Sequence, residues 1–144
     1  MTKPLNIILA EDDLEDQTFF KSALSELPIS TMITTFRNGE ELMNYLIRNS
    51  TSYGSTDILF LDLSMPHKTG IECLIEIKEN AILKDLKVVM FTCSFRRDIE
   101  FEQNLINRLT RMGAEGFIRK PDSFEELKNI IETTLNRLMD KNTL

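Results

Sequence analysis

Short apolar runs of strand length alternate along the chain with segments whose apolar residues recur three and four positions apart. No other feature constrains the fold as strongly, because the two spacings are those of strands and of helices that pack on a sheet. We interpret these runs as strands: Asn6 to Ala10, Met32 to Phe36, Ile58 to Leu61, Val88 to Phe91 and Gly116 to Ile118. Strands that alternate with helices predict an α/β fold of the doubly wound kind, a five-stranded parallel sheet with helices on both faces.

The segments between the strands, and the one after the last strand, are predicted to be helices. Their apolar stripes consist of Phe20, Ala23, Leu24 and Leu27; Leu42, Met43, Leu46 and Ile47; Ile71, Leu74 and Ile75; Leu105, Leu109 and Met112; and Phe124, Leu127, Ile131, Leu135 and Leu138. Ser123 and Glu126 open the last stripe with the pattern of a capping box, in which each side chain bonds the backbone amide of the other residue. The residues expected in or near the core also include Phe19, Phe36, Phe91, Cys73 and Cys93.

Length and charge narrow the classes of function. The chain has 144 residues, and we expect residues 1–144 to form one domain with no output domain after the last helix. The formal net charge is −6 and no block of lysine and arginine is found, which argues against binding to DNA or RNA. The sequence contains neither a signal peptide nor an apolar stretch of the roughly 20 residues that cross a bilayer, so we expect a cytoplasmic protein that does not enter the membrane.

Residues able to do chemistry follow the predicted strands at the point where each strand ends. Glu11 and Asp12 follow the first strand, and Asp62 follows the third. Thr92 follows the fourth strand, and Lys120 follows the fifth. In doubly wound folds ligands bind at the carboxyl ends of the strands, where the strand order reverses. We therefore expect these side chains to meet in one crevice.

Three of these residues are carboxylates, and in one crevice they would repel one another. At about 4 Å and an effective dielectric constant near 20, each pair of like charges costs about 4 kcal/mol. A hard cation removes this cost, and Mg²⁺ takes one or two carboxylates together with water and phosphate oxygens. Lys120 adds a positive charge and Thr92 a hydroxyl donor, both suited to a phosphoryl group. Taken singly, an acidic residue after a strand can instead cap a helix, a role open to Glu11 or Asp13.

Asp62 is costly to place at the end of a buried strand unless its carboxylate has a chemical role. A carboxylate can attack phosphorus as a nucleophile and form an aspartyl phosphate. Phosphoryl transfer depends mainly on positioning and charge neutralisation, which the other strand-end residues can provide. The set of strand-end residues is thus suited to phosphoryl chemistry at Asp62.

The pattern D-x-x-M-P-x-x-x-G begins at Asp62 and continues through Met65, Pro66 and Gly70. Together with the acidic pair after the first strand, the threonine after the fourth and the lysine-proline step after the fifth, it gives the chain a resemblance to bacterial response-regulator receiver domains over residues 5–138. The chain is similar in particular to single-domain regulators associated with phytochromes. The resemblance implies a flavodoxin-like (βα)₅ receiver fold with strand order 2-1-3-4-5.

The resemblance also implies a role for each site residue. Asp62 would receive a phosphoryl group from a histidine of a sensor kinase or of a histidine phosphotransfer protein, and Lys120 would bind that group. Asp12 and Asp62 would bind Mg²⁺ directly, Glu11 would bind it through water, and the backbone carbonyl of Ser64 would complete the set. The protein would not be an enzyme, apart from its own phosphorylation and dephosphorylation.

Signalling would pass through a pair of residues near the site. The hydroxyl of Thr92 would move to the phosphoryl group and the ring of Phe117 would move inward. The face built from the fourth helix, the fifth strand and the fifth helix would then bind a downstream protein or a second copy of the chain, and a lengthened segment at 95–112 would reshape it. A cis bond to Pro121 would aim Lys120.

Other functions fit parts of the same pattern. A haloacid-dehalogenase-like phosphohydrolase also uses a strand-end aspartate, but it needs a second aspartate two residues on, where this chain has Ser64. A flavodoxin would cradle the flavin phosphate with its first loop, which here carries Glu11, Asp12 and Asp13 and would repel it. A receiver-like interaction protein that is not phosphorylated usually lacks an acidic residue or the lysine of the site, whereas this chain has all of them.

A phosphorelay shuttle, which passes its phosphoryl group on to another histidine, cannot be distinguished by sequence from a protein-binding switch. His67, the single histidine, is expected to be a solvated loop residue.

Overall fold

The computed structural model describes residues 4–49, 53–54, 56–92 and 98–140, and every structural statement below refers to these residues. In this part of the chain a sheet is formed by five parallel strands: β1 (Leu5–Ala10), β2 (Thr31–Phe36), β3 (Asp57–Leu61), β4 (Lys87–Thr92) and β5 (Gly116–Arg119). Their order across the sheet is β2-β1-β3-β4-β5, so the predicted order is confirmed. Every strand begins and ends within one residue of its predicted bounds.

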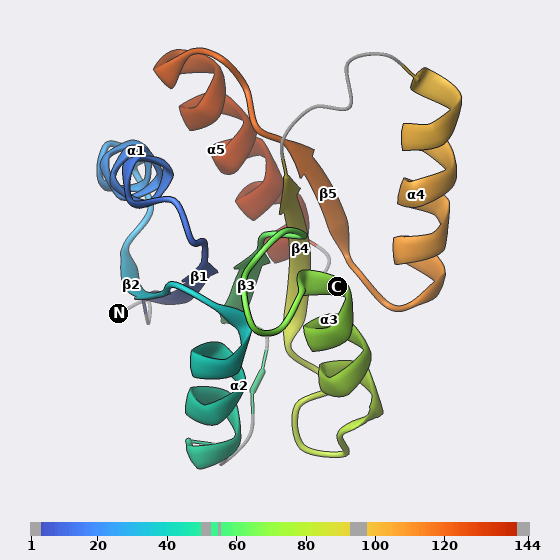
Figure 1. Cartoon of the computed structure of the whole chain (residues 1–144). Helices are drawn as coiled ribbons and strands as arrows, with labels where there is room; N and C mark the ends of the chain where they lie inside the picture. Colours follow the sequence, from blue (N-terminus) through green and yellow to red (C-terminus); the bar gives the residue numbers. More distant parts are fainter. Residues whose placement is uncertain (1–3, 50–52, 55, 93–97, 141–144) are drawn as a thin grey trace.

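Helices cover both faces of the sheet, as the doubly wound fold requires (Figure 1). The helices are α1 (Leu14–Ser25), α2 (Gly39–Arg48), α3 (Gly70–Glu79), α4 (Ile99–Arg111) and α5 (Phe124–Asp140). Buried residues of α1 and α5 pack on one face, and those of α2, α3 and α4 pack on the other. Within the described ranges no helix has the length and apolar character needed to cross a membrane.

The sheet has a core on each face because successive residues of a strand point to opposite sides. On the face of α1 and α5, the ring of Phe20 meets the rings of Phe60 and Phe91 edge-on, with centroids 4.9 and 5.5 Å away. On the other face, Leu59 and Met90 are fully buried under α2, α3 and α4. Burial on both faces explains why the runs of β3 and β4 are continuously apolar.

Not every residue expected in the core lies there. Phe19 is 51% exposed, so its predicted place in the core is wrong. The reason is helical geometry, because Phe20 and Ala23 occupy the side of α1 that packs on the sheet. Cys73 is fully buried as expected, whereas Cys93 lies outside the described residues.

Side-chain caps fix where the helices begin. Asp13 caps α1, because its carboxylate accepts a hydrogen bond of 3.0 Å from a first-turn amide. Before α5, the hydroxyl of Ser123 accepts from the amide of Glu126 at 3.1 Å, which is one of the two hydrogen bonds of the predicted capping box. A complete capping box stands before α3, where Thr69 and Glu72 each bond the backbone amide of the other. This box fixes the start of the helix that follows the loop after β3.

A charged clamp ties the elements together at the amino-terminal edge of the sheet. The ammonium of Lys78, at the end of α3, donates to the carbonyl of Leu86 at 2.9 Å and lies 3.2 Å from a carboxylate oxygen of Glu115. The other carboxylate oxygen of Glu115 accepts a hydrogen bond from the amide of Val88 at 2.6 Å. The backbone carbonyl of Glu115 accepts a hydrogen bond from Arg137 of α5 at 3.2 Å. The clamp therefore joins α3, β4, β5 and α5 at the edge opposite to the strand ends.

Candidate phosphoacceptor site

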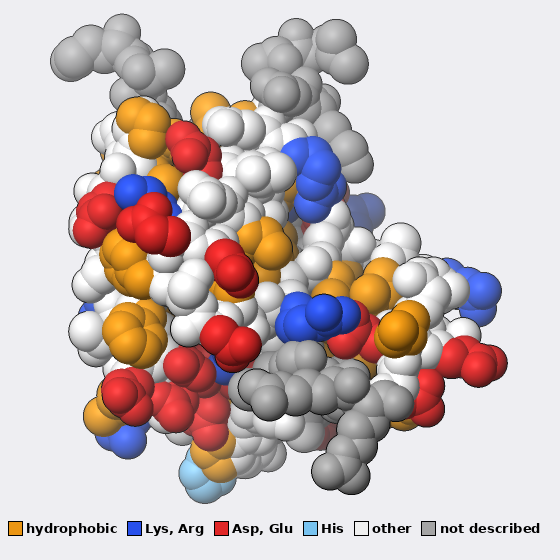
Figure 2. All heavy atoms as spheres, turned by 90° about the horizontal axis from the view of Figure 1, so that it is seen from above, with side chains coloured by type: hydrophobic (Ala, Val, Ile, Leu, Met, Phe, Trp, Pro, Cys, Tyr) orange, Lys and Arg blue, Asp and Glu red, His pale blue; other side chains and the backbone are white. Residues whose placement is uncertain are grey.

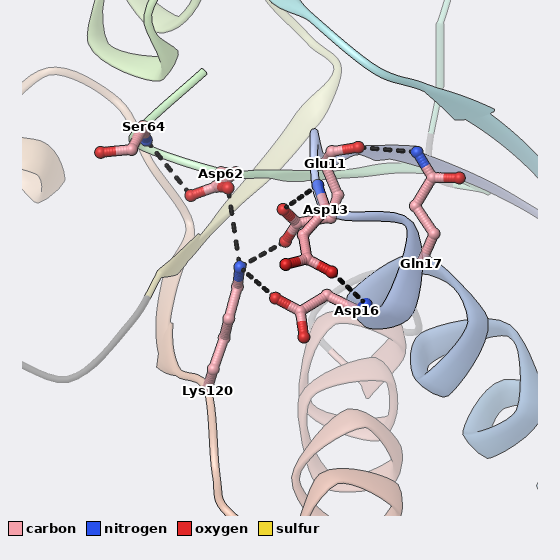
Figure 3. Close-up of polar contacts among 7 residues, drawn as sticks. All are labelled: Glu11, Asp13, Asp16, Gln17, Asp62, Ser64 and Lys120. Carbon is pink, nitrogen blue, oxygen red and sulfur yellow. Dashed lines mark hydrogen bonds and ion pairs between the residues drawn. The ribbon is translucent and has the colours of Figure 1, made fainter. Parts of the chain in front are cut away.

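The ends of four strands bring the predicted site residues to one edge of the sheet. β1 and β3 are paired in register, so Glu11 and Asp62 emerge side by side (Figure 3). β4 and β5 are paired so that the amide of Lys120 donates to the carbonyl of Thr92 at 2.7 Å. Glu11, Asp62 and Thr92 are buried, with 0%, 4% and 5% of their surface exposed. The crevice predicted from the sequence is present in the fold.

Three carboxylates form a cluster that fits a divalent cation. Glu11, Asp12 and Asp62 each offer an oxygen, and these oxygens all lie within 4.8 Å of one another. Oε2 of Glu11 accepts from the amide of Asp13 at 3.1 Å, while the buried Oε1 contacts the ammonium of Lys120. Three carboxylate oxygens held this close together form an all-oxygen donor set, which suits a hard cation of the Mg²⁺ kind.

The ammonium of Lys120 reaches three carboxylates from the other side of the crevice (Figure 3). It makes a close ion pair with Glu11, donates to Asp16 at 3.1 Å and lies 3.6 Å from Asp62. The same nitrogen stands 5.3 Å from the centre of the Phe91 ring, within the range of a cation–π contact. Asp16 was not among the predicted site residues, because its contact depends on the turn by which α1 begins after Asp13.

Burial sets the protonation of the site. It raises the pKa of Glu11 to about 8, with the carboxylate of Asp62 adding to the rise and Lys120 opposing it. It raises the pKa of Asp62 as well, against the hydrogen bond from Glu11 and the charge of Lys120. Burial alone would lower the pKa of Lys120, but the surrounding carboxylates outweigh it and raise that pKa. Burial therefore raises the pKa values of Glu11 and Asp62 more than the repulsion between the carboxylates does, although the sequence pointed to repulsion.

The loop after β3 holds Asp62 through its backbone. The amide of Ser64 donates to Oδ1 of Asp62 at 3.2 Å. Gly70 packs so closely that a Cβ there would stand 2.1 Å from the carbonyl oxygen of Asp62, which explains physically why the pattern ends in glycine.

His67 lies in the same loop, is exposed and has a φ of 69°, a left-handed conformation that favours glycine. A hollow beside the carboxylates is lined by Asp12, Leu63, Ser64, Met65, Pro66 and Thr69.

Thr92 and Phe117 occupy the same side of the sheet. Phe117 is paired with Met90 of β4, and both pack in the core under α2, α3 and α4. Thr92 lies two residues beyond Met90, so strand alternation directs its side chain to this same side.

The prediction of a cis peptide bond between Lys120 and Pro121 is wrong, because no described peptide bond is cis. With a trans bond the lysine already reaches the carboxylates, so no cis bond is needed to aim it.

Acidic side chains surround the entrance to the site. Figure 2 looks onto the strand-end side of the molecule and shows a crowd of Asp and Glu side chains next to the single histidine. Asp12, Asp13 and Glu15 are exposed here, above the buried Glu11 and Asp62. The described surface around the entrance to the crevice is therefore rich in negative charge.

Comparison with known proteins agrees with this geometry. The family model of the response regulator receiver domain matches residues 7–132, and the chain belongs to this family. Receiver domains are signalling domains of two-component systems, and they interact with histidine kinases and downstream targets.

Relatives and solved structures give the extent of the likeness. Response regulator Rcp1 of Synechocystis sp. is 33% identical over 97 residues, 66% of this chain and 66% of Rcp1. The two-component response regulator ARR5 of Arabidopsis thaliana is 26% identical over 92% of this chain and 72% of its own. The cyclic-nucleotide phosphodiesterase regA of Dictyostelium discoideum is 23% identical over 95% of this chain. This match covers only 16% of the length of regA.

Among solved structures, a response regulator receiver domain from Rhodospirillum rubrum superposes with a TM-score of 0.78 at 26% identity, covering 97% of this chain and 95% of that one. The phosphorylated cyanobacterial phytochrome response regulator RcpA gives a TM-score of 0.76 at 27% identity, over 92% and 91% of the two chains. The likeness thus includes both sequence and fold.

Proposed function

We propose that this receiver domain accepts a phosphoryl group on Asp62 and signals through the change that follows. The observation that carries the proposal is the position of the Asp62 carboxylate, which is buried beside the two acidic residues that follow β1 and lies 3.6 Å from the ammonium of Lys120. A nucleophile set between a cation site and a fixed positive charge is the arrangement that phosphoryl transfer needs.

The donor that we propose is a phosphohistidine of a sensor kinase or of a histidine phosphotransfer protein. A carboxylate oxygen of Asp62 forms a bond to phosphorus, the bond between phosphorus and the imidazole nitrogen breaks, and its electron pair stays on that nitrogen. The amide of Ser64 holds the other carboxylate oxygen in place. Lys120 lies near enough to neutralise the oxygens of the transferred group.

A divalent cation, which we propose to be Mg²⁺, would be held by the carboxylates of Asp12 and Asp62, by Glu11 and by the carbonyl of Ser64. When bound it would neutralise the charge that builds on the phosphoryl oxygens. Glu11 is the buried member of the acidic pair and Asp12 the exposed one, so Asp12 is the residue that an entering cation meets first.

Output is proposed to be a protein–protein event at the face of α4, β5 and α5, in the cytoplasm. Thr92 and Phe117 would connect this face to Asp62, since both lie on the side of the sheet that α4 covers. Ile99 and Phe101 of α4 are 88% and 53% exposed, which provides apolar surface for a partner or a second copy of the chain. A groove at the end of β5 and along α5 is lined by Arg119, Lys120, Pro121, Asp122, Glu126, Asn129, Ile130 and Thr133.

The test is phosphorylation by acetyl phosphate or by a phosphorylated kinase, with and without Mg²⁺. We expect intact-mass spectrometry to show one added phosphoryl group that needs Mg²⁺ and that hydroxylamine removes, as it does from acyl phosphates. Asp62→Asn should abolish the addition, whereas Asp122→Asn, a change at an exposed aspartate near the site, should leave it intact. Labelling that persists in Asp62→Asn would place the phosphoryl group elsewhere and refute the proposal.

A further inference from the structure

We infer that Asp16 is a positioning residue that holds the ammonium of Lys120 away from Asp62 until a phosphoryl group arrives. The inference rests on the proposed function of Asp62 and deepens it, because it assigns a task to a side chain of α1. It predicts that Asp16 restrains the phosphorylated state rather than supporting it.

The contacts of Lys120 are unequal. Its ammonium donates a hydrogen bond to Asp16 at 3.1 Å, but it lies 3.6 Å from Asp62, beyond hydrogen-bond reach (Figure 3). Its closest carboxylate contact is the ion pair with Glu11, so Glu11 and Asp16 hold the ammonium together. In the unphosphorylated protein the lysine is thus bound on the α1 side of the crevice.

The position of Asp16 is fixed by the start of α1. The carboxylate of Asp13 accepts from the backbone amide of Asp16 at 3.0 Å and so sets the first turn of the helix. The side chain of Gln17 is buried and donates to the carbonyl of Glu11 at 2.6 Å, which fastens the same turn to the end of β1. These two bonds keep the Asp16 carboxylate within reach of the ammonium.

Of the three ion pairs of Lys120, the one with Asp16 can be broken at the lowest cost in free energy. The side chain of Asp16 is 35% exposed, whereas those of Glu11 and Asp62 are 1% and 6% exposed. Water can replace the ammonium at a carboxylate that is partly in solvent, but not at a buried one. When phosphoryl oxygens appear at Asp62, the hydrogen bond to Asp16 is therefore the contact that is exchanged for them.

The experiment compares the wild type with three variants at one fixed Mg²⁺ concentration. Asp16→Asn removes the charge and keeps the shape, while Asp16→Glu keeps the charge. Glu15→Gln is the matched control, because Glu15 is the adjacent exposed carboxylate and makes none of the described contacts with Lys120. Affinity for beryllofluoride, a mimic of the phosphoryl group, is measured by ¹⁹F NMR titration.

We expect Asp16→Asn to bind beryllofluoride about fivefold more tightly, the effect of removing one partly exposed charge pair. Its acyl phosphate should decay more slowly by a similar factor. Glu15→Gln should change both by less than about twofold, and Asp16→Glu should remain close to the wild type. In the metal-free protein, the ¹⁵N signal of the Lys120 ammonium should move in Asp16→Asn and stay in place in Glu15→Gln, which reports the contact directly.

Equal affinities in Asp16→Asn and Glu15→Gln, or weaker binding in Asp16→Asn, would overturn the inference while leaving the phosphoacceptor role of Asp62 intact. A wild type that binds no beryllofluoride would instead refute the proposed function, and the inference would fall with it. The unphosphorylated NMR signal separates the two cases, because it depends on the resting contact alone.

Discussion

The buried carboxylate of Glu11 should make the metal-free protein less stable as the pH rises. Its pKa is raised from an ordinary value of 4.5 to about 8 by burial, with the charge of Asp62 adding to the effect. Between these two values the folded protein holds a proton that the unfolded chain has released. Stability from this group is therefore complete below pH 4.5, falls as the pH rises and is lost above pH 8.

The size of the effect follows from the same two values. Each pH unit between them changes the free energy of unfolding by up to about 1.4 kcal/mol, which gives about 3 to 5 kcal/mol over the whole interval. Because the side chain of Glu11 is only 1% exposed, solvent screening reduces this little. A loss of that size is a large part of the roughly 5 to 15 kcal/mol that stabilises a typical domain.

The assay is urea unfolding at pH 5, 6.5 and 8 in the presence of a chelator, on the wild type and on Glu11→Gln. The difference between the two proteins reports the titration of Glu11 together with its coupling to Asp62, and removes the contribution of the more distant titrating groups. We expect the wild type to lose at least about 3 kcal/mol more than Glu11→Gln between pH 5 and pH 8. Mg²⁺ at about a hundred times its dissociation constant should restore about 2.7 kcal/mol to the wild type at pH 8. Parallel stability profiles of the two proteins would refute the reasoning.

Three further predictions concern the site loop and the switch. Gly70→Ala should cost about 1 to 3 kcal/mol in urea unfolding and slow phosphorylation, because the new methyl group collides with the carbonyl of Asp62; unchanged phosphorylation would show that the loop yields without moving the nucleophile. His67→Gly should stabilise the protein by about 0.5 to 1 kcal/mol, since it relieves a left-handed backbone, and a loss of stability would contradict this reading. Thr92→Ala should still accept a phosphoryl group but should respond less to beryllofluoride in partner binding or self-association measured by sedimentation; a response equal to the wild type would exclude the switch through Phe117.

The sequence predicted the strands and their end residues well, for a physical reason. Runs that are buried on both faces, such as those that end at Leu61 and Phe91, have no polar residue until the strand reaches the edge, so the first polar residue marks the edge. The residues Asp62 and Thr92 were found in this way. A site made of strand ends is therefore readable without knowledge of the side-chain contacts.

The helix residues that contact the site could not be predicted from the sequence in the same way. Which side of α1 faces the strand ends depends on the turn that follows Asp13, so neither the exposure of Phe19 nor the contact of Asp16 follows from apolar spacing alone. The trans bond before Pro121 is likewise a tertiary outcome, because both isomers are accessible to such a bond in an unfolded chain.

The clamp of Lys78 and Glu115 lies at the opposite edge of the sheet from the phosphoacceptor residues. This separation gives the protein two regions that natural selection can alter independently. Substitutions at the clamp should therefore change the free energy of unfolding while the contacts of Asp62 stay as they are.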